Sequence, residues 1–466
     1  MKSISRRTFN TLVASSLVGG TAATGESKPR RRPEKRPNVL FIAMDDMNTC
    51  LGCYGHPIVK SPNIDRLAAQ GVRFELACCQ YPLCNPSRTS LLTGLRAETT
   101  RIMDNNTSAR SVMPDMLTLP QHFRANGYHT ATVGKIFHGK FPDPTSWEEQ
   151  LPLVPRDWQK QRHFVPRESS GEPPPTEEGD RIVWQMTDSP DFAEPDGAAA
   201  LSAAEFLRRE YEKPFFLAVG IHKPHMPYVA PKKYFDLYEV GAIPPPSTPE
   251  GDLDDIPPVA LTPHREGDPK SDQQFRETIR AYYACMSFAD AQVGVVLEAM
   301  HQSGHDDDTI VVFWSDHGFH LGEHGGLWRK TTLFEEVSRA PFIISAPHDG
   351  FARGVCPHPV EFIDIFPTLV EWCGLPAPGK LQGRSLVPAL RNPDAPIREG
   401  AITVVRHTDT LGRSVRTRRW RYTEWGGPDV AELYDHQTDP REYRNLAKDP
   451  GHAATIAHLQ GLLRAG

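Results

Sequence analysis

The chain has 466 residues, with 52 basic and 58 acidic side chains and a formal net charge of −6. This balance argues against nucleic acid as a partner, because proteins that bind nucleic acid usually carry a clearly basic domain. Hydrophobic residues make up 39% of the chain, which suffices for a sizeable core but not for a polytopic membrane protein. We therefore expect one large globular domain and a smaller one.

The N-terminus has the features of an export signal. Arg6 and Arg7 precede an uncharged stretch, Thr11 to Ala23, that ends in small residues. This arrangement is typical of a twin-arginine signal peptide, and the alternative is a simple basic tail. The stretch is too short for a stable membrane span. We predict that residues 1–36 are signal peptide and basic linker, and that the twin-arginine translocase exports the protein to the periplasm or the medium.

The cysteines do not predict a disulfide framework. Eight cysteines are few for a chain of this length. Cys50 and Cys53 have CxxC spacing, but no second pair follows at the spacing of a zinc finger. We therefore favour free thiols at this pair over a metal or redox site.

The fold prediction rests on apolar strands that alternate with helices. In chain order, the pattern predicts a strand at 38–43, helices at 63–70, 119–126 and 198–210, a strand at 214–219, a helix at 275–303 and a strand at 309–314. Continuous apolar runs indicate parallel strands that are buried on both faces. The alternation predicts a doubly wound α/β sheet, whose sites form outside the carboxyl ends of the strands.

Two stretches interrupt this pattern. Residues 141–195 and 242–272 are rich in Pro, Asp, Glu and Gly, and strand and helix patterns continue after each of them. We predict that both are surface insertions around a pocket.

The end of the chain has a different character. From about residue 394, short alternating segments at 401–405 and 418–425 precede a helix that begins near Ala453. We predict a small antiparallel C-terminal domain over 394–466, after a large domain over 37–393.

Acidic residues follow two of the predicted strands. Asp45 and Asp46 come directly after the first strand, and Asp316 follows the strand at 309–314. As isolated residues, Asp45 and Asp46 would be turn or capping carboxylates. Adjacent carboxylates at a buried strand end are costly without a cation, however, and calcium prefers such hard oxygen ligands. We therefore predict a calcium site.

The most specific motif is C-N-P-S-R-T-S-L-L-T-G, from Cys84 to Gly94. A lone cysteine here would be a buried thiol before a helix. The whole motif, however, resembles the signature of type I sulfatases, C-x-P-S-R-x-x-x-L-T-G, at every fixed position. The resemblance implies that a formylglycine-generating maturation enzyme converts Cys84 to 3-oxoalanine (formylglycine). It also implies that Arg88 holds this side chain.

Three further motifs supply basic residues. Gly134 to His138 resembles the sulfatase element G-K-x-x-H, His222 to His225 resembles H-K-P-H, and the stretch G-G-L-W-R-K from Gly325 ends at Lys330. Singly, such residues would be solvated cations or hydrogen-bonded histidines. The resemblance implies that Lys135, His138 and Lys330 contact the sulfate, and that His225 is the general acid.

The resemblance also assigns the metal ligands. It implies that calcium is bound by Asp45, Asp46, Asp316 and the modified Cys84. His317 stands where many sulfatases have asparagine, but the iduronate-2-sulfatase branch also has histidine there, so we include it as a ligand.

Two other stretches match family patterns. His320, Glu323 and His324 resemble the L-G-E-H stretch, and we interpret them as structural or supporting residues. The run from Arg413 to Arg421 resembles a C-terminal pattern of the family. We predict an edge strand there, and a groove for polyanions is the alternative.

The resemblance extends from about Arg36 to the end and is closest to the iduronate-2-sulfatase branch. It implies an alkaline-phosphatase-like fold, with a large mixed sheet flanked by helices and a smaller α+β domain at the C-terminus. The implied function is removal of O-sulfate from a sulfated sugar, with a 2-O-sulfated uronate as the favoured substrate. Alternatives are a phosphonate or phosphate ester hydrolase, a choline-sulfatase-like enzyme and a non-catalytic protein that binds sulfated glycans.

Overall fold

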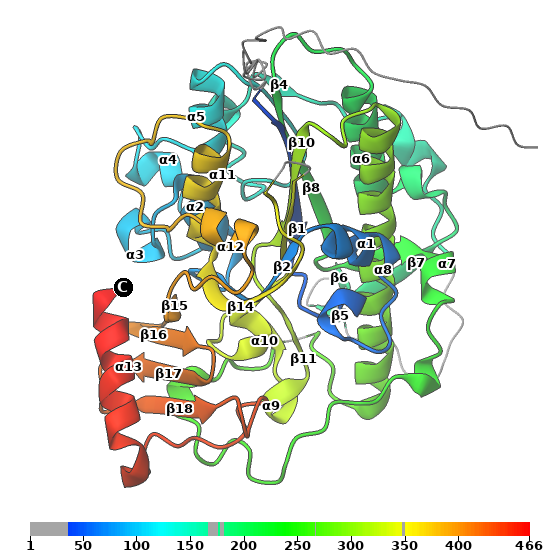
Figure 1. Cartoon of the computed structure of the whole chain (residues 1–466). Helices are drawn as coiled ribbons and strands as arrows, with labels where there is room; N and C mark the ends of the chain where they lie inside the picture. Colours follow the sequence, from blue (N-terminus) through cyan, green and yellow to red (C-terminus); the bar gives the residue numbers. More distant parts are fainter. Residues whose placement is uncertain (1–35, 166–175, 178–180, 266, 347–349) are drawn as a thin grey trace, which may run out of the picture. The chain divides into compact units, whose positions relative to one another are not determined.

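The computed structural model describes residues 36–165, 176–177, 181–265, 267–346 and 350–466 (Figure 1). Residues 36–466 form one compact unit. The predicted export signal lies outside the described residues, apart from Arg36. Among the described residues, every helix is too short or too polar to cross a membrane.

An eight-stranded sheet forms the centre of this unit. Its strand order is β14-β2-β13-β10-β1-β8-β3-β4. β10, β1, β8, β3 and β4 run parallel, whereas β13 is antiparallel to both of its neighbours. The strands are β1 (Asn38–Asp45), β2 (Val72–Cys78), β3 (His129–Gly134), β4 (Glu149–Gln150), β8 (Phe215–Pro224), β10 (Thr309–Ser315), β13 (Phe342–Ser345) and β14 (Gly354–Glu361). The predicted mixed α/β sheet is therefore confirmed.

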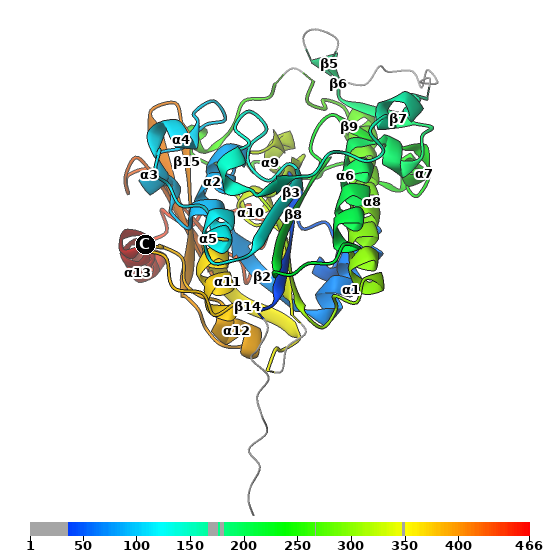
Figure 2. The same cartoon turned by 90° about the horizontal axis from the view of Figure 1, so that it is seen from above.

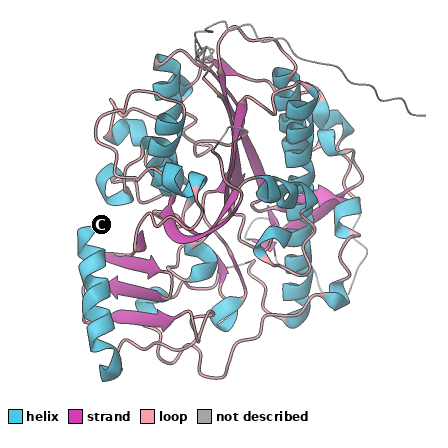
Figure 3. Cartoon of the chain, in the orientation of Figure 1, coloured by secondary structure: helices cyan, strands magenta, loops and turns pink. Residues whose placement is uncertain are grey.

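Helices cover both faces of the sheet, as Figures 1 and 2 show from two directions. One layer contains α1 (Pro62–Gln70), α6 (Pro195–Leu207) and α8 (Asp272–Gln302). The other contains α2 (Cys84–Thr93), α5 (Leu119–Ala125), α11 (Ile365–Trp372) and α12 (Val387–Arg391). Figure 3 shows the strands between the two helical layers.

Short elements complete the unit. They are α3 (Ala97–Thr100), α4 (Ala109–Val112), α7 (Lys232–Phe235), α9 (Glu323–Gly326), α10 (Glu335–Ser338), β5 (Thr176–Glu177), β6 (Arg181–Ile182), β7 (Trp184–Thr187), β9 (Tyr228–Pro231), β11 (His320–Leu321) and β12 (Trp328–Arg329). Most of the described residues in the two predicted insertions lie in such short elements or in loops. β4 differs, because it extends the main sheet beside β3.

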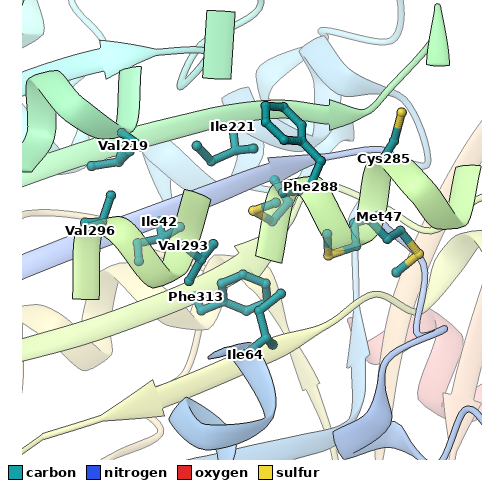
Figure 4. Close-up of a cluster of buried hydrophobic side chains, with 14 of the residues drawn as sticks. Ile42, Met47, Ile64, Val219, Ile221, Cys285, Phe288, Val293, Val296 and Phe313 are labelled. Carbon is teal, nitrogen blue, oxygen red and sulfur yellow. The ribbon is translucent and has the colours of Figure 1, made fainter. Parts of the chain in front are cut away.

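The core between α8 and the sheet is apolar and fully packed (Figure 4). Ile42, Val219 and Phe313 come from three neighbouring strands, and Phe288 and Val293 come from α8; none exceeds 1% exposure. Burying each such side chain contributes about 1.5–3 kcal/mol. This packing fixes the strand ends, where the polar residues lie.

The C-terminal domain contains a separate antiparallel sheet. β15 (Gly400–His407), β16 (Thr410–Thr417), β17 (Trp420–Trp425) and β18 (Ala431–Asp435) pair in sequence order, and α13 (Ala453–Ala465) contacts β16 and β17. The predicted edge strand from Arg413 to Arg421 is wrong. A turn in which Trp420 N donates to Thr417 Oγ1 divides this run between β16 and β17, which both lie inside the sheet.

Two predicted boundaries also differ. α6 begins at Pro195, because Pro at the first helical position is already fixed at a helical φ, and it ends at Leu207 rather than at residue 210. β8 continues to Pro224, because Asp45 of β1 pairs with Pro224 after a change of register. This extension brings His222 and Lys223 to the end of the sheet.

Candidate active site

The three aspartates meet where β1 and β10 end. These strands are parallel neighbours with Met44 opposite Ser315, so Asp45, Asp46 and Asp316 emerge side by side. Their carboxylate oxygens lie within 4.8 Å of one another, and all three residues are buried. Asp46 N donates to Asp316 Oδ1 at 3.2 Å, which links the two strand ends.

The chain makes a strained turn at Asp46. This residue has φ +60, a value that is uncommon outside glycine. Tyr282 of α8 fixes the turn, because its hydroxyl donates to Asp46 O at 2.7 Å and accepts from Asn48 N at 2.9 Å. Tyr282 was not among the predicted site residues. It lies in the middle of a long helix and belongs to no motif, so nothing in the sequence marks it.

Cys84 lies against this carboxylate group. It is the first residue of α2 and is only 1% exposed. Its Sγ lies 3.8 Å from Asp46 Oδ1 and 3.1 Å from Lys330 Nζ. The helix is tied to the strand end, because Ser87 Oγ donates to Asp316 O at 2.5 Å.

Glycines in two of the motifs have structural roles. Gly94 ends α2 with φ +69. Gly134, with φ +75, packs against the neighbouring strand so closely that a Cβ would lie 1.9 Å from Gly220 O. Only glycine fits there, and the close contact places the next residue, Lys135, beside the strand ends.

Arg88 differs from its predicted role. Its side chain is fully buried, and all five N–H donors have protein acceptors. Nε donates to Asp316 Oδ2 at 2.8 Å and Nη2 to Asp45 Oδ1 at 3.2 Å. The remaining donors reach the carbonyl oxygens of Met44, Lys135 and Ile136. Arg88 therefore orients the carboxylates, and its contact with a modified Cys84 stays a prediction.

Two lysines neutralise part of the acidic charge. Lys135 Nζ donates to Asp45 Oδ2, and Lys330 Nζ donates to Asp46 Oδ1. Burial alone would raise the pKa of Asp46, but Lys330, His225 and His317 outweigh it and hold this pKa well below its usual range. The pKa of Asp45 is likewise lowered, so these two carboxylates are ionised, as metal ligands must be.

His317 satisfies a specific test for a metal ligand. Its Nδ1 lies 2.8 Å from Gly318 O, the geometry of an N–H that donates to a carbonyl. Its Nε2 is buried without a hydrogen-bond partner, 3.4 Å from Asp46 Oδ1 and 3.6 Å from Asp316 Oδ1. Burial would lower the pKa of His317, but Asp316 and Asp46 outweigh it and raise this pKa. In its neutral form, an imidazole held in this way presents its Nε2 lone pair to the carboxylate group, as a metal-binding histidine does.

The two histidines of the H-K-P-H element face the same carboxylates. His225 Nε2 lies 3.8 Å from Asp46 Oδ2, and its Nδ1 lies 2.5 Å from Met226 O. His222 Nδ1 lies 3.3 Å from Asp45 Oδ2, and burial lowers the pKa of His222 to about 3. Lys223 instead donates to the carbonyl oxygens of His225 and Pro227, which indicates a structural role.

The sequence analysis missed Asp196, which holds this element in place. Asp196 lies in the first turn of α6 and is 4% exposed. Its two carboxylate oxygens accept from His222 N and Lys223 N, both at 2.8 Å. The only sequence signal was an acidic residue in the first turn of a helix, which usually indicates capping.

A cavity of about 530 Å³ adjoins these residues. Its lining includes Lys135, His138, Lys140, Trp147 and His225. Burial, reinforced by Lys135, lowers the pKa of His138 to about 4, and its Nδ1 has no hydrogen-bond partner. The structure thus places His138 beside Lys135 and His225, within reach of an anionic ligand in the cavity.

Other candidates lie outside this cluster. Cys50 and Cys53 are free and partly buried, and burial raises the pKa of Cys50 to about 12, which disfavours a reactive thiolate.

His320 also lies outside this cluster. Its Nε2 pairs with Thr332 Oγ1 at 2.8 Å, and its Nδ1 lies 3.4 Å from Glu323.

Four of the five arginines between Arg413 and Arg421 are paired with acids, and the fifth, Arg418, is exposed. Arg413 pairs with Glu98, Arg416 with Glu335, Arg419 with Asp435 and Arg421 with Glu442. These charges are neutralised within the protein, so the run favours a structural role over a groove for polyanions.

Comparisons with known proteins agree with this geometry. The family model described as sulfatase matches residues 37–375, and a model of the C-terminal part of N-sulphoglucosamine sulphohydrolase matches residues 322–465. The chain is 34% identical to a sulfatase of Formosa agariphila, over 94% of this chain and 89% of that protein. It is 31% identical to the iduronate 2-sulfatase of Homo sapiens, over 88% of this chain and 91% of that protein.

Solved structures show the same fold. The phosphonate monoester hydrolase of Agrobacterium radiobacter is similar with a TM-score of 0.75 and 25% identity, over 92% of this chain and 96% of that one. A 2-O GAG sulfatase is similar with a TM-score of 0.71 and 24% identity, over 92% of both chains. These likenesses confirm the alkaline-phosphatase-like fold. Because the family model matches well over half of its length, the chain belongs to the sulfatase family.

Proposed function

We propose that this sulfatase removes O-sulfate from a sulfated carbohydrate, with a 2-O-sulfated uronate as substrate, through a formylglycine made from Cys84 and a bound calcium ion. One observation carries the proposal. Three kinds of ligand atom converge beside two part-buried lysines: Cys84 Sγ, oxygens of three buried aspartates, and His317 Nε2, which has no hydrogen-bond partner. A sulfate ester is an anion whose cleavage needs such neutralising charge, a nucleophile and an acid.

The calcium ion would be held by Asp45, Asp46, Asp316 and His317. When bound, it would supply positive charge that polarises the sulfate oxygens and the nucleophile. The residues fit this role, because the carboxylates of Asp45 and Asp46 have lowered pKa values and His317 Nε2 has no hydrogen-bond partner in the protein. Arg88 keeps two of these carboxylates in position. Formylglycine at residue 84 would supply a hydroxyl nucleophile in its hydrated form.

Lys135 and Lys330 neutralise the sulfate group. Each ammonium group already lies within hydrogen-bond distance of a carboxylate of the site, and Lys330 also reaches the side chain at position 84. Asp46 raises the pKa of Lys330 against the effect of burial, so this lysine stays charged. A fixed cation there stabilises negative charge that develops on the sulfate oxygens.

His225 gives a proton to the leaving oxygen. Its Nδ1–H is held by Met226 O, so the proton that can be transferred is on Nε2, which faces the site. The side chain is 29% exposed, so it can exchange this proton with solvent between turnovers.

The cavity beside His225 suits an acidic sugar. Lys140 supplies positive charge, His138 supplies hydrogen-bonding nitrogens, and Trp147 supplies an apolar wall. The likeness to iduronate 2-sulfatases favours a uronate, whose carboxylate adds a second negative charge.

We further propose that residues 1–36 direct export to the periplasm or the medium, and that residues 37–393 and 394–466 form the catalytic and C-terminal domains.

The substrate test uses calcium-loaded protein that is co-expressed with a formylglycine-generating enzyme. We expect inorganic sulfate release from a 2-O-sulfated iduronate disaccharide. An aryl sulfate serves as the matched control, because its cleavage requires the same chemistry without the sugar. Turnover of the aryl ester alone would contradict the uronate assignment and leave the sulfatase mechanism intact.

A second candidate function is hydrolysis of phosphonate or phosphate monoesters. The structural likeness to phosphonate monoester hydrolases favours it. Aryl sulfate, aryl phosphate and phenyl phosphonate esters with the same leaving group separate the two functions. A strong preference for either phosphorus ester would overturn the sulfatase proposal.

A further inference from the structure

We propose that His324, Glu336 and Glu442 form a second metal site, specific for a transition-metal cation of the Zn²⁺ type. Their ligand atoms lie within 4.8 Å of one another. His324 and Glu336 belong to α9 and α10 of the large domain, whereas Glu442 follows β18 of the C-terminal domain. A cation there would join the two domains, and none of its ligands belongs to the carboxylate group around Cys84.

The imidazole of His324 has no hydrogen-bond partner. The residue is 1% exposed, yet neither ring nitrogen makes a hydrogen bond. Buried polar groups without partners are rare and cost about 1–3 kcal/mol each. Phe334 stacks on the ring with a centroid distance of 4.0 Å, so the plane of the imidazole is fixed. A bound cation would satisfy this otherwise costly side chain.

One ring nitrogen has a carboxylate beside it. Nδ1 of His324 lies 3.4 Å from Asp252 Oδ2, and the carboxylate of Asp252 is buried without hydrogen bonds. A proton on Nδ1, facing Asp252, leaves the Nε2 lone pair free for a cation. Metal-bound histidines typically direct their other nitrogen to a carboxylate in this way.

Glu336 has a carboxylate oxygen that accepts no hydrogen bond. Its Oε2 is buried without a hydrogen bond, and its nearest ion pair, with Arg441, spans 3.8 Å. The residue also lines a cavity of about 350 Å³ that includes Glu323, Arg339 and Arg441. This cavity therefore borders one of the three proposed ligands.

Two of the three proposed ligands have left-handed backbones. His324 has φ +48 and Glu442 has φ +59. Such conformations cost about 1–3 kcal/mol for a residue other than glycine, and they cluster at ligand-binding positions. Glu442 is also fixed by its ion pair with Arg421, by His436 at 2.8 Å and by Glu335 N at 2.9 Å. The surrounding protein therefore holds this carboxylate in place before any cation binds.

The ligand types select the cation. One imidazole and two carboxylates suit Zn²⁺ and its neighbours Co²⁺ and Mn²⁺, whereas Ca²⁺ and Mg²⁺ prefer oxygen ligands alone. Excess Ca²⁺ competes with Zn²⁺ for the aspartate site, and variants of the His324 site distinguish Zn²⁺ bound there from any Zn²⁺ bound at the aspartates. The inference does not depend on sulfatase activity.

The test uses the full chain with Cys84→Ala, which removes the thiolate that could bind Zn²⁺ at the first site. After treatment with a chelator, this protein is titrated with Zn²⁺ in excess Ca²⁺ and followed by calorimetry. We expect about one Zn²⁺ per chain, and loss of that equivalent in Glu336→Gln and His324→Gln. His122→Gln is the control, because His122 of α5 is also buried but lies outside the site.

No Zn²⁺ binding by the parent, or equal binding by the parent and Glu336→Gln, would overturn the proposal. If His324→Gln fails to fold, Glu336→Gln decides the question. Glu336 is partly exposed, and glutamine has nearly the same shape as glutamate, so we expect this variant to fold. Crystals soaked in Zn²⁺ and Ca²⁺ give a second measurement. An anomalous zinc peak bonded to His324, Glu336 and Glu442 supports the site, and a peak at the aspartates alone contradicts it.

Discussion

At the scale of single residues, Arg88 has the largest effect on the site. Its planar guanidinium contacts the carboxylates of two strands and three carbonyl oxygens at once. The sulfatase signature contains an arginine here, so the residue type was predictable. Its contacts were not, because they depend on how α2 meets the ends of β1 and β10.

Replacing Arg88 with lysine tests this role. A lysine keeps the charge but cannot make five hydrogen bonds, so buried carboxylate and carbonyl groups lose their partners. We expect the free energy of unfolding to fall by about 3–5 kcal/mol. Urea unfolding of the calcium-free protein measures this change. Arg66→Lys, at an exposed position of α1, is the control, and equal stability of the two variants would contradict the role.

At the scale of secondary-structure elements, the residues of the site lie at the ends of strands and at the starts of helices. The sequence predicted that Asp45, Asp46 and Asp316 would meet, because apolar runs followed by acids mark the carboxyl ends of neighbouring parallel strands. It did not predict Asp196, since the contact joins the start of α6 to an extension of β8 that the apolar pattern did not reveal.

The substitution Asp196→Asn tests whether α6 positions the H-K-P-H element. An amide group offers one acceptor where two backbone N–H groups need partners, so residues 222–225 should loosen. We expect kcat to fall about 10- to 100-fold with a smaller change in KM, because small displacements of catalytic groups have effects of this size. Asp236→Asn, at an exposed ion pair of α7, should leave kcat unchanged. An unchanged kcat in Asp196→Asn would refute this positioning role.

Another element-scale prediction concerns β18. Burial raises the pKa of Glu432 from 4.5 to about 7, although Trp425 donates a hydrogen bond to its carboxylate. The folded protein therefore keeps a proton that the unfolded chain loses, so this group reduces stability as pH rises from about 4.5 to about 7. Above pH 7 its effect is constant.

The substitution Glu432→Gln removes this titration. Relative to the wild type, the variant should gain about 3 kcal/mol of unfolding free energy between pH 4.5 and pH 7.5. Chemical denaturation across this range measures the difference. The exposed Glu205→Gln, in α6, should show no such trend, and a difference for Glu432→Gln that stays constant with pH would contradict the raised pKa.

At the scale of the whole molecule, buried charges join the two domains. Arg421 of β17 pairs with both Glu335 of α10 and Glu442, and Arg416 also pairs with Glu335. The alternating segments near the C-terminus predicted a small antiparallel sheet. They did not predict this junction, because charged residues in a strand usually indicate a solvent-facing side, and only the assembled fold buries them.

The central claim is that Cys84, once converted to formylglycine, is the nucleophile of a metal-dependent sulfatase. Sulfate release from an aryl sulfate by matured, calcium-loaded protein tests it most directly, in the wild type, in Cys84→Ala and in the control Cys285→Ala. We predict release by the wild type and the control, loss of release after treatment with a chelator, and no turnover by a folded Cys84→Ala. Near-normal release by Cys84→Ala would contradict the account.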